Sequence, residues 1–439
     1  MRRRCGSLTA LRAACFYGFL GLPGIAQTQP TPPEDPLFEP MLKKPADFDA
    51  AAQYAVSTAK AGDLEASIGA LERLLFFNPQ LARVRFEIGA LYFRLGSFEM
   101  ARGYFETAQN SADATDELKQ RAQEYILVID QKLQPDQWAG FLQTGFRYQT
   151  NATFGPNQQS LLGATRPINS QFLPRSDGNW FGFFNLNYAH DFGTQNGDLF
   201  EASLSAYDAQ QFTATAVDTG ALDFRAGPRF GLPLESLSGV SIKPYAALSG
   251  ATLADAAYVG SFGGGVTARF TLAGVAFDPY VEVRRANYRN STLYPFASEL
   301  DGRLIEVGLP AWGQITSGIR WQARFAYSGD DCAVPWYSYD RYAFDFWLPL
   351  SIPSLWRGPS WTLTPSFGVA PWLYRQPDPV ADPFKTERDV EWRVGLGLDV
   401  PIEGRFGIGL QVQYRTLISN IPGNTVKDFS TTIGPTISF

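Results

Sequence analysis

The chain of 439 residues is long enough for two domains or for one large barrel with a smaller module, and its net charge of −6 gives no reason to expect a nucleic-acid partner. Its mean hydropathy of −0.15 is too polar for a bundle of transmembrane helices, whereas 14% aromatic residues and 41 glycines are typical of a transmembrane β-barrel. With one histidine and three cysteines there is almost no material for a metal site or a hydrolytic triad, so we expect no enzyme activity, no metal and no cofactor.

Residues 1–26 are predicted to be a signal peptide. Three arginines lead into a short apolar stretch over Ala13–Leu22, and Gly24–Ala26 offers a small-x-small cleavage site. Removal of this segment would leave Cys332 as a single cysteine, which cannot form an intramolecular disulfide. Residues 27–47 are rich in proline and are predicted to be a flexible linker.

From residue 48 to residue 134 the apolar period is helical, and small and large residues recur at an offset of 34. The recurring pairs are Ala55 with Gly89, Gly62 with Gly96, Leu64 with Phe98, Ser67 with Ala101, and Leu71 with Phe105. This pattern resembles the tetratricopeptide repeat, in which small residues let two antiparallel helices approach closely. A further amphipathic helix up to Leu133 is expected to cap the stack.

In that repeat family the first helix of each repeat lines a concave groove. The resemblance implies that Arg83, Phe86, Phe93 and Arg94 point into it. One interpretation is a client-binding groove with aromatic contacts flanked by charge. The alternative is that Phe86 and Phe93 pack against a neighbouring domain.

At Trp138 the apolar period changes from 3.6 to 2 and does not change back. The strand-like stretches are 138–150, 180–190, 198–208, 221–230, 240–250, 257–270, 276–289, 300–309, 317–328, 340–350, 360–371, 389–400, 405–416 and 427–439. Bacterial single-chain barrels prefer even strand numbers, so residues 138–439 are predicted to form a transmembrane antiparallel β-barrel of about 14 strands. The fold class is therefore α + β and multidomain, a short tetratricopeptide α-solenoid followed by the barrel.

The connections between these stretches differ in length. The first, 151–179, is the longest, and the second closes at a turn around 195–197. If the helical repeats lie in the periplasm, odd-numbered connections should be external and long, and even-numbered ones short. Two departures are expected, a short external loop at 251–256 and a long internal turn at 351–359.

The polar positions of the strands are expected to face the lumen. The charged residues among them are Arg147, Asp223, Arg225, Arg229, Glu282, Arg284, Arg320, Arg324, Glu391, Arg393 and Arg415. Mixed inward charges can line a water-filled path or pair across it, and the concentration of arginine suggests pairing with acidic segments in transit. Aromatic residues near strand ends, including Trp321 and Trp372, are interpreted as a membrane-interface girdle. Gly263–Gly265 is interpreted as a kink in the barrel wall.

The last stretch alternates an apolar with a small polar residue and reaches Phe439. A closing strand of this kind, with a final aromatic residue, resembles bacterial outer-membrane β-barrels. We therefore expect Phe439 to act as a barrel-assembly signal and the barrel assembly machinery and outer-membrane lipids to be partners.

A cleaved signal, a short helical repeat module and a carboxy-terminal barrel together resemble the surface lipoprotein assembly modifier (Slam) family. Gly145–Ala152 resembles the Gly-x-x-Tyr…Asn pattern at the end of that family's first strand. The resemblance implies a Gram-negative outer-membrane translocation factor that delivers lipoproteins or related small secreted proteins to the cell surface. The repeats would bind the client or a chaperone in the periplasm, and the barrel would translocate.

Two other functions remain open. Exopolysaccharide export porins also join tetratricopeptide modules to a barrel, although with longer repeat arrays. A simple diffusion porin with a helical appendage should conduct small ions and bind no partner through its repeats. A neighbouring gene for a lipoprotein would favour the first function, and one for a glycosyltransferase would favour polysaccharide export.

Overall fold

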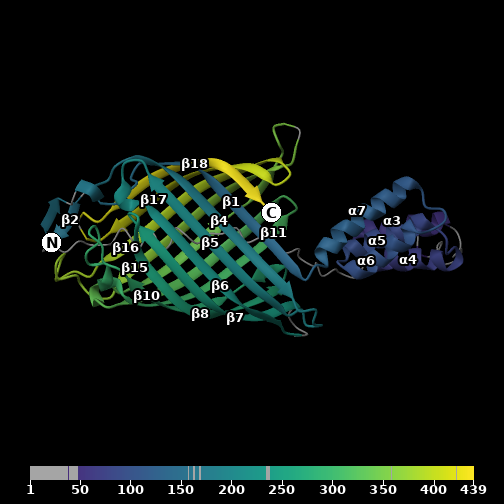
Figure 1. Cartoon of the computed structure of the whole chain (residues 1–439), viewed down its shortest axis with the longest axis horizontal. Helices are drawn as coiled ribbons and strands as arrows, with labels where there is room; N and C mark the ends of the chain where they lie inside the picture. Colours follow the sequence, from purple (N-terminus) through teal and green to yellow (C-terminus); the bar gives the residue numbers. More distant parts are fainter. Residues whose placement is uncertain are drawn as a thin grey trace. The chain divides into compact units, whose positions relative to one another are not determined.

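The structure of the protein is a computed structural model. It describes residue 38 and residues 48–156, 158–161, 164–167, 170–233, 238–356, 358–421 and 423–439. The predicted signal peptide (1–26) and nearly all of the predicted linker (27–47) lie outside the described residues. The described chain divides into two compact units, a helical one that ends at Gln137 and a barrel from Trp138 to Phe439 (Figure 1).

The helical unit consists of two helical hairpins followed by a longer helix. In chain order the helices are α3 (Phe48–Ala61), α4 (Leu64–Phe77), α5 (Ala82–Arg94), α6 (Phe98–Gln109) and α7 (Asp116–Lys132). A glycine follows the first helix of each hairpin, Gly62 directly after α3 and Gly96 two residues after α5, with φ of 92° and 78°. Glycine adopts this left-handed backbone without steric cost, so the sequence repeat is a repeat of the hairpin. Among the described residues, no helix is both long enough and apolar enough to cross a membrane.

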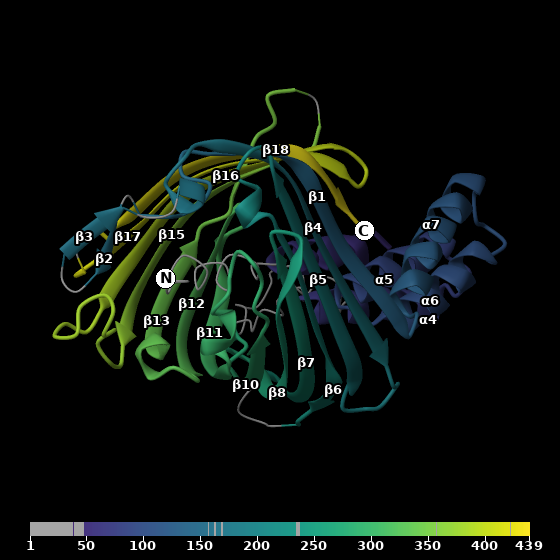
Figure 2. The same ribbon diagram turned by 60° about the vertical axis from the view of Figure 1, so that its left-hand side comes forward.

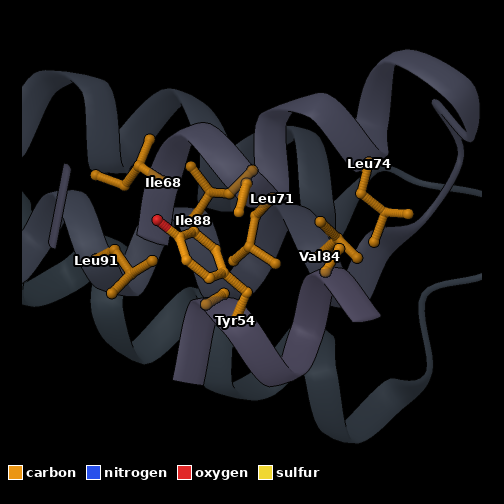
Figure 3. Close-up of a cluster of buried hydrophobic side chains, with 10 residues drawn as sticks. Tyr54, Ile68, Leu71, Leu74, Val84, Ile88 and Leu91 are labelled. Atoms are coloured by element: carbon orange, nitrogen blue, oxygen red, sulfur yellow. The ribbon is translucent and has the colours of Figure 1, made fainter. Parts of the chain in front are cut away.

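One apolar core lies between α3, α4 and α5. Figure 3 labels seven of its side chains: Tyr54, Ile68, Leu71, Leu74, Val84, Ile88 and Leu91. A second core joins α5, α6 and α7 through the fully buried Phe105 and Ile129. A Cβ atom added at Gly89 on α5 would lie 3.0 Å from the Phe105 ring, so a small residue is needed there for α5 and α6 to pack.

A polar contact joins α4, α5 and α6. The hydroxyls of Tyr92 and Tyr104 both donate to Oε1 of Glu72, at 3.1 and 2.8 Å, and the two rings stack. Burial, followed by the charge and hydrogen bonding of Glu72, raises the pKa of both hydroxyls above its ordinary value of 10.0. The contact therefore depends on the tyrosines remaining protonated.

Fourteen antiparallel strands among the described residues close into a barrel. They are β1 (Asp136–Gln149), β4 (Asp177–Asp191), β5 (Leu199–Gln211), β6 (Thr219–Gly231), β7 (Ser238–Leu253), β8 (Ala256–Leu272), β9 (Val275–Phe277) with β10 (Tyr280–Tyr288), β11 (Gly302–Thr316), β12 (Ile319–Cys332), β13 (Tyr339–Trp347) with β14 (Leu350–Ile352), β15 (Trp361–Tyr374), β16 (Arg388–Glu403), β17 (Phe406–Ser419) and β18 (Val426–Ser438). Each predicted stretch overlaps one of these strands, so the predicted fold class is confirmed. A small hairpin, β2 (Gln158–Leu161) and β3 (Ala164–Pro167), lies in the first connection.

Prolines interrupt two of the barrel strands. Pro279 separates β9 from β10, and Pro349 separates β13 from β14. Proline has no backbone N–H, so the hydrogen-bond ladder loses a donor at each point. The proline carbonyls still accept, from the N–H groups of Ala268 at 2.9 Å and Arg320 at 3.0 Å, which holds the broken strands in the wall.

The pairing of β1 with β18 closes the barrel, and Figure 2 shows the two strands side by side. Gly140 and Phe439 exchange two backbone hydrogen bonds, of 2.7 and 3.0 Å. A Cβ atom added at Gly434 would lie only 1.8 Å from the carbonyl oxygen of Thr144. The seam thus requires glycine where the two strands approach most closely.

The two ends of the barrel carry different connections. The turn rim, where β1 begins, has two-residue connections at 273–274, 317–318 and 404–405. The loop rim at the opposite end has long connections at 150–176, 289–301 and 375–387. Both expected departures are confirmed: residues 254–255 form a tight turn at the loop rim, and residues 353–360 form a longer connection at the turn rim.

The tyrosine contact predicts a loss of helical-unit stability at alkaline pH. The folded chain holds both tyrosine protons more tightly than the unfolded chain, so the stabilisation is complete below about pH 10 and is lost as pH rises above it. Glu72→Gln keeps an acceptor but removes the charge, and should lose less stability between about pH 8 and about pH 11. Thermal unfolding followed by circular dichroism at the helical minimum measures both. Equal losses in the two proteins would show that Glu72 is not responsible.

Candidate functional site

The barrel interior is the candidate site, because alternate residues of every strand point into it. Arg147 identifies the inner face: its Nη1 donates to the Tyr207 hydroxyl at 2.8 Å, and its guanidinium lies 5.1 Å from the centre of the Phe181 ring. The strand register extends this face around the barrel. The residues expected in the lumen all lie on it: Arg147, Asp223, Arg225, Arg229, Glu282, Arg284, Arg320, Arg324, Glu391, Arg393 and Arg415.

The outer face carries large apolar side chains that are open to the surroundings. Leu248, Phe262, Phe325 and Val394 are each more than half exposed, at 54%, 55%, 57% and 53%. Charged residues occupy the inner positions of the same strands. In water this arrangement would be inverted, so the outer face is a lipid-facing one, and the barrel spans a membrane.

Aromatic residues mark both ends of the outer face. Near the turn rim, the Trp138 and Tyr188 rings lie 4.5 Å apart, and near the loop rim Trp180 contacts Phe146 and Phe212. These positions fit aromatic belts at two membrane interfaces. Trp372 was expected in such a girdle and the structure corrects this: the register places it on the inner face, where it is buried opposite Arg341.

The first inner cluster is a closed ring of two acids and two arginines, here called the quartet. Asp223 accepts from Arg225 and Arg284, each at 2.6 Å. Glu282 accepts from the same two arginines, at 2.9 and 2.5 Å, and from the Tyr245 hydroxyl at 3.0 Å. Each charge therefore has two partners of opposite sign, which is the condition under which buried ions are tolerated.

The wall beside the quartet is made of glycine. Gly263 lies opposite Arg284, and Gly265 lies opposite Glu282. A Cβ atom at Gly263 would lie 2.0 Å from the carbonyl oxygen of Val283, so β8 and β10 approach more closely than other residues allow. Gly265 in turn leaves room for the Tyr245 side chain, whose hydroxyl oxygen would lie 2.6 Å from an added Cβ atom.

The second inner cluster is a chain of five charges, here called the ladder. It runs from Arg324 to Asp345, Arg393, Glu391 and Arg415. Its nitrogen–oxygen distances are 3.2, 2.7, 2.9 and 2.6 Å. The side chain of Glu391 is completely buried, and its Oε1 contacts both neighbouring arginines.

A third group lies nearer the turn rim. Glu201 accepts from Arg229 and Lys243, both at 2.9 Å. Most of the inner arginines are therefore compensated by acids of the barrel wall. Arg320, by contrast, is exposed to the interior. The sequence analysis identified the arginines but missed Asp345, because its pairing with Arg324 and Arg393 depends on the register of the strands.

An apolar cluster from the connections lies above the quartet at the loop rim. Tyr294 and Leu300 from the 289–301 connection pack with Tyr258 and Tyr288 of the wall. The Tyr294 hydroxyl donates to the carbonyl oxygen of Ala216 at 2.6 Å, which ties a second connection to this cluster. A cavity of about 140 Å³ remains between the cluster and the quartet.

In the helical unit, the four predicted groove residues have different surroundings. Arg83 and Arg94 are exposed, whereas Phe86 is 4% exposed and Phe93 is half-buried. Both phenylalanines contact Tyr125 of α7, with ring centres 5.7 and 5.3 Å away. Phe86 is therefore a core residue and not a groove residue, because α7 folds over this side of α5.

The position of Phe86 predicts a stability effect. Phe86→Ala should lower the free energy of unfolding of the helical unit by about 3–5 kcal/mol, because a buried ring is lost. Arg83→Ala should change it by less than about 0.5 kcal/mol, because that side chain is exposed. Chemical denaturation followed by the helical circular dichroism signal measures both. If Phe86→Ala leaves the free energy of unfolding unchanged, Phe86 is not a core residue.

The quartet predicts a second effect. Asp223→Asn removes the negative charge shared by the buried Arg284 and the partly exposed Arg225, at a cost of about 3–5 kcal/mol. On detergent gels of heated samples, the temperature at which the band of the folded barrel is replaced by the band of the unfolded chain should fall. Adding Arg284→Gln removes the excess positive charge and should restore part of the loss. If the double variant is no better than the sum of the two single changes, the charges are not coupled.

The comparisons with known proteins add distant likenesses only. No known family model matches the chain, and no curated protein matches it in sequence. The barrel is similar in structure to an anion-selective porin from Comamonas acidovorans (7% identity, TM-score 0.36, 69% of this chain and 99% of that chain). It is also similar to a bacterial polysaccharide outer membrane secretin (12%, 0.34, 69% and 98%) and to OccAB3 from Acinetobacter baumannii (9%, 0.35, 69% and 99%).

The membrane assignment rests on the two faces of the chain's own strands. A closed barrel satisfies every backbone ladder without an open edge, and its apolar exterior with aromatic belts fits lipid. Barrels of this architecture belong to outer membranes. The protein is an outer-membrane β-barrel with a polar, charged interior.

Proposed function

We propose that the chain is an outer-membrane translocation factor that helps deliver lipoproteins or related small proteins to the bacterial cell surface. The observation that carries the proposal is the joining of two kinds of structure in one chain. The last helix of the helical unit ends at Lys132, and after three intervening residues the first strand of a transmembrane barrel begins at Asp136. A pore alone has no need of the first unit.

The connection lengths support a periplasmic position for the helical unit. Outer-membrane barrels have short periplasmic turns and longer external loops, so the turn rim is the periplasmic one. β1 begins at that rim and directly follows α7 in the chain. A client or chaperone would therefore meet the helices before the barrel.

Exposed apolar residues on the helices support partner binding. Phe76 and Phe77 at the end of α4 are 82% and 45% exposed, and Leu127 and Val128 lie exposed on α7. Arg83 and Arg94 add exposed positive charge on α5. In this proposal the two arginines contact the client, and the buried Phe86 only supports the helix that carries them.

Surface display of a lipoprotein encoded beside this chain tests the proposal. Protease shaving of intact cells should find the lipoprotein exposed when the chain is present and protected when it is absent. The double change Arg83→Glu and Arg94→Glu should remove most of the exposure, because it reverses the charge offered to the client. The matched control is Lys119→Glu, which reverses an exposed charge on α7.

Unchanged exposure without the chain, with the barrel inserted in cells that carry it, would overturn the proposal for that client. Glycan export or simple diffusion would then be the functions to test. If the Arg83→Glu and Arg94→Glu double variant leaves the lipoprotein exposed while deletion of the chain abolishes exposure, the client does not contact these two arginines.

A further inference from the structure

The cavity of about 140 Å³ between the quartet and the apolar cluster of the loop rim is large enough for a small organic molecule. It is lined by β6, β7, β8, β10 and β11, which are neighbours in the barrel wall (Figure 2), and by Leu300 of the 289–301 connection. A closed apolar cavity of about 150 Å³ holds one benzene molecule. A molecule whose apolar part is about that size therefore fits.

The lining of this cavity is apolar toward the loop rim. Tyr258 and Tyr288 are each 7% exposed, and their rings meet edge to face with centres 5.2 Å apart. Leu253, Leu300 and Leu304 add aliphatic surface. An apolar body placed here would lose contact with water, which favours binding.

The charges that line the cavity do not balance. The two acids and two arginines of the quartet compensate one another. Glu306 of β11 is a third carboxylate in the lining, and among the described residues it forms no ion pair. Two arginines against three carboxylates leave one negative charge.

Glu306 has an oxygen available to a ligand. The Tyr280 hydroxyl donates to its Oε1, whereas no group of the described chain donates to its Oε2. Glu306 also lies directly opposite Glu282 on the neighbouring strand β10. Like charges in this position repel, so a cation beside Glu306 would be stabilising. An ammonium group, which has only donors, suits a free carboxylate oxygen.

We propose that the cavity binds a small organic cation, a primary ammonium group on an apolar body about the size of a benzene ring. The ammonium group donates to Oε2 of Glu306, and the body lies against Leu300, Leu304 and the tyrosine rings. The surplus negative charge disfavours a carboxylate or phosphate ligand. The site depends on the cavity and not on which cargo the barrel carries.

Calorimetric titration of the full-length protein in a non-ionic detergent with benzylammonium, at constant ionic strength, tests the proposal. Titration into detergent alone gives the baseline. The natural protein should bind benzylammonium at one saturable site. Benzyl alcohol, which has the same ring without the charge, should bind about tenfold to hundredfold more weakly, because a charged hydrogen bond is lost. Equal affinity for the two would overturn the proposal.

Glu306→Gln tests the role of the carboxylate. The amide oxygen still accepts from the Tyr280 hydroxyl, so the wall keeps this contact while the charge is removed. Benzylammonium should then bind no more tightly than benzyl alcohol does. A preference for benzylammonium that survives in Glu306→Gln would overturn the proposal.

The matched control is Asp399→Asn. Asp399 is an inner carboxylate of β16 that also forms no ion pair among the described residues, but it does not line the cavity. This variant should keep the preference for benzylammonium over benzyl alcohol. An equal loss of preference in Asp399→Asn would overturn the proposal, because the cation would then respond to the general charge of the interior.

Ala251→Leu tests whether the ligand occupies the cavity. Ala251 lines it and is only half-buried, so a leucine side chain extends into the free space. Benzylammonium and benzyl alcohol should both lose saturable binding. Binding of benzylammonium as tight as in the natural protein would place the ligand outside the cavity and overturn the proposal.

Discussion

The structure depends on the closure of the barrel by the pairing of β1 with β18. In lipid an open strand edge would leave a row of backbone groups without partners, and each would cost several kcal/mol. Closure removes that edge and fixes which residues face inward. Small residues at the seam make it possible, since Gly145 and Gly434 lie where a side chain would collide with the facing strand. The charge clusters and the apolar exterior both follow from this one register.

The charged residues of the barrel interior form local ion pairs, so the interior does not carry charge of one sign only. Asp223, Glu282 and Glu391 are nearly or fully buried, and each contacts two arginines. Such groups fix the wall in one conformation, because moving one side chain would leave another charge uncompensated. A molecule that enters this barrel would therefore meet fixed ion pairs, and only side chains outside the pairs could change partners easily.

The strands could be predicted from the sequence because a two-residue alternation and the lengths of the connections are local signals. Contacts between strands that are distant in the chain could not be predicted. Arg225 pairs with Glu282 across 57 residues, and this depends on the register of three intervening strand pairs. Trp372 was misassigned because nearness to a strand end does not show which face of the strand a residue occupies. Phe86 was misassigned because the sequence did not show that α7 folds over α5.

The proposed binding role of the helical unit has an energetic argument. Its two cores already bury the residues that a short repeat stack needs, including Leu74 and Phe105. Phe76, Leu127 and Val128 remain exposed after these cores are complete, so folding of the unit does not require them. Exposed apolar groups reduce solubility unless something covers them. Since the exposed arginines of α5 add charge to the same small unit, a partner with both acidic and apolar groups fits it better than a purely ionic one.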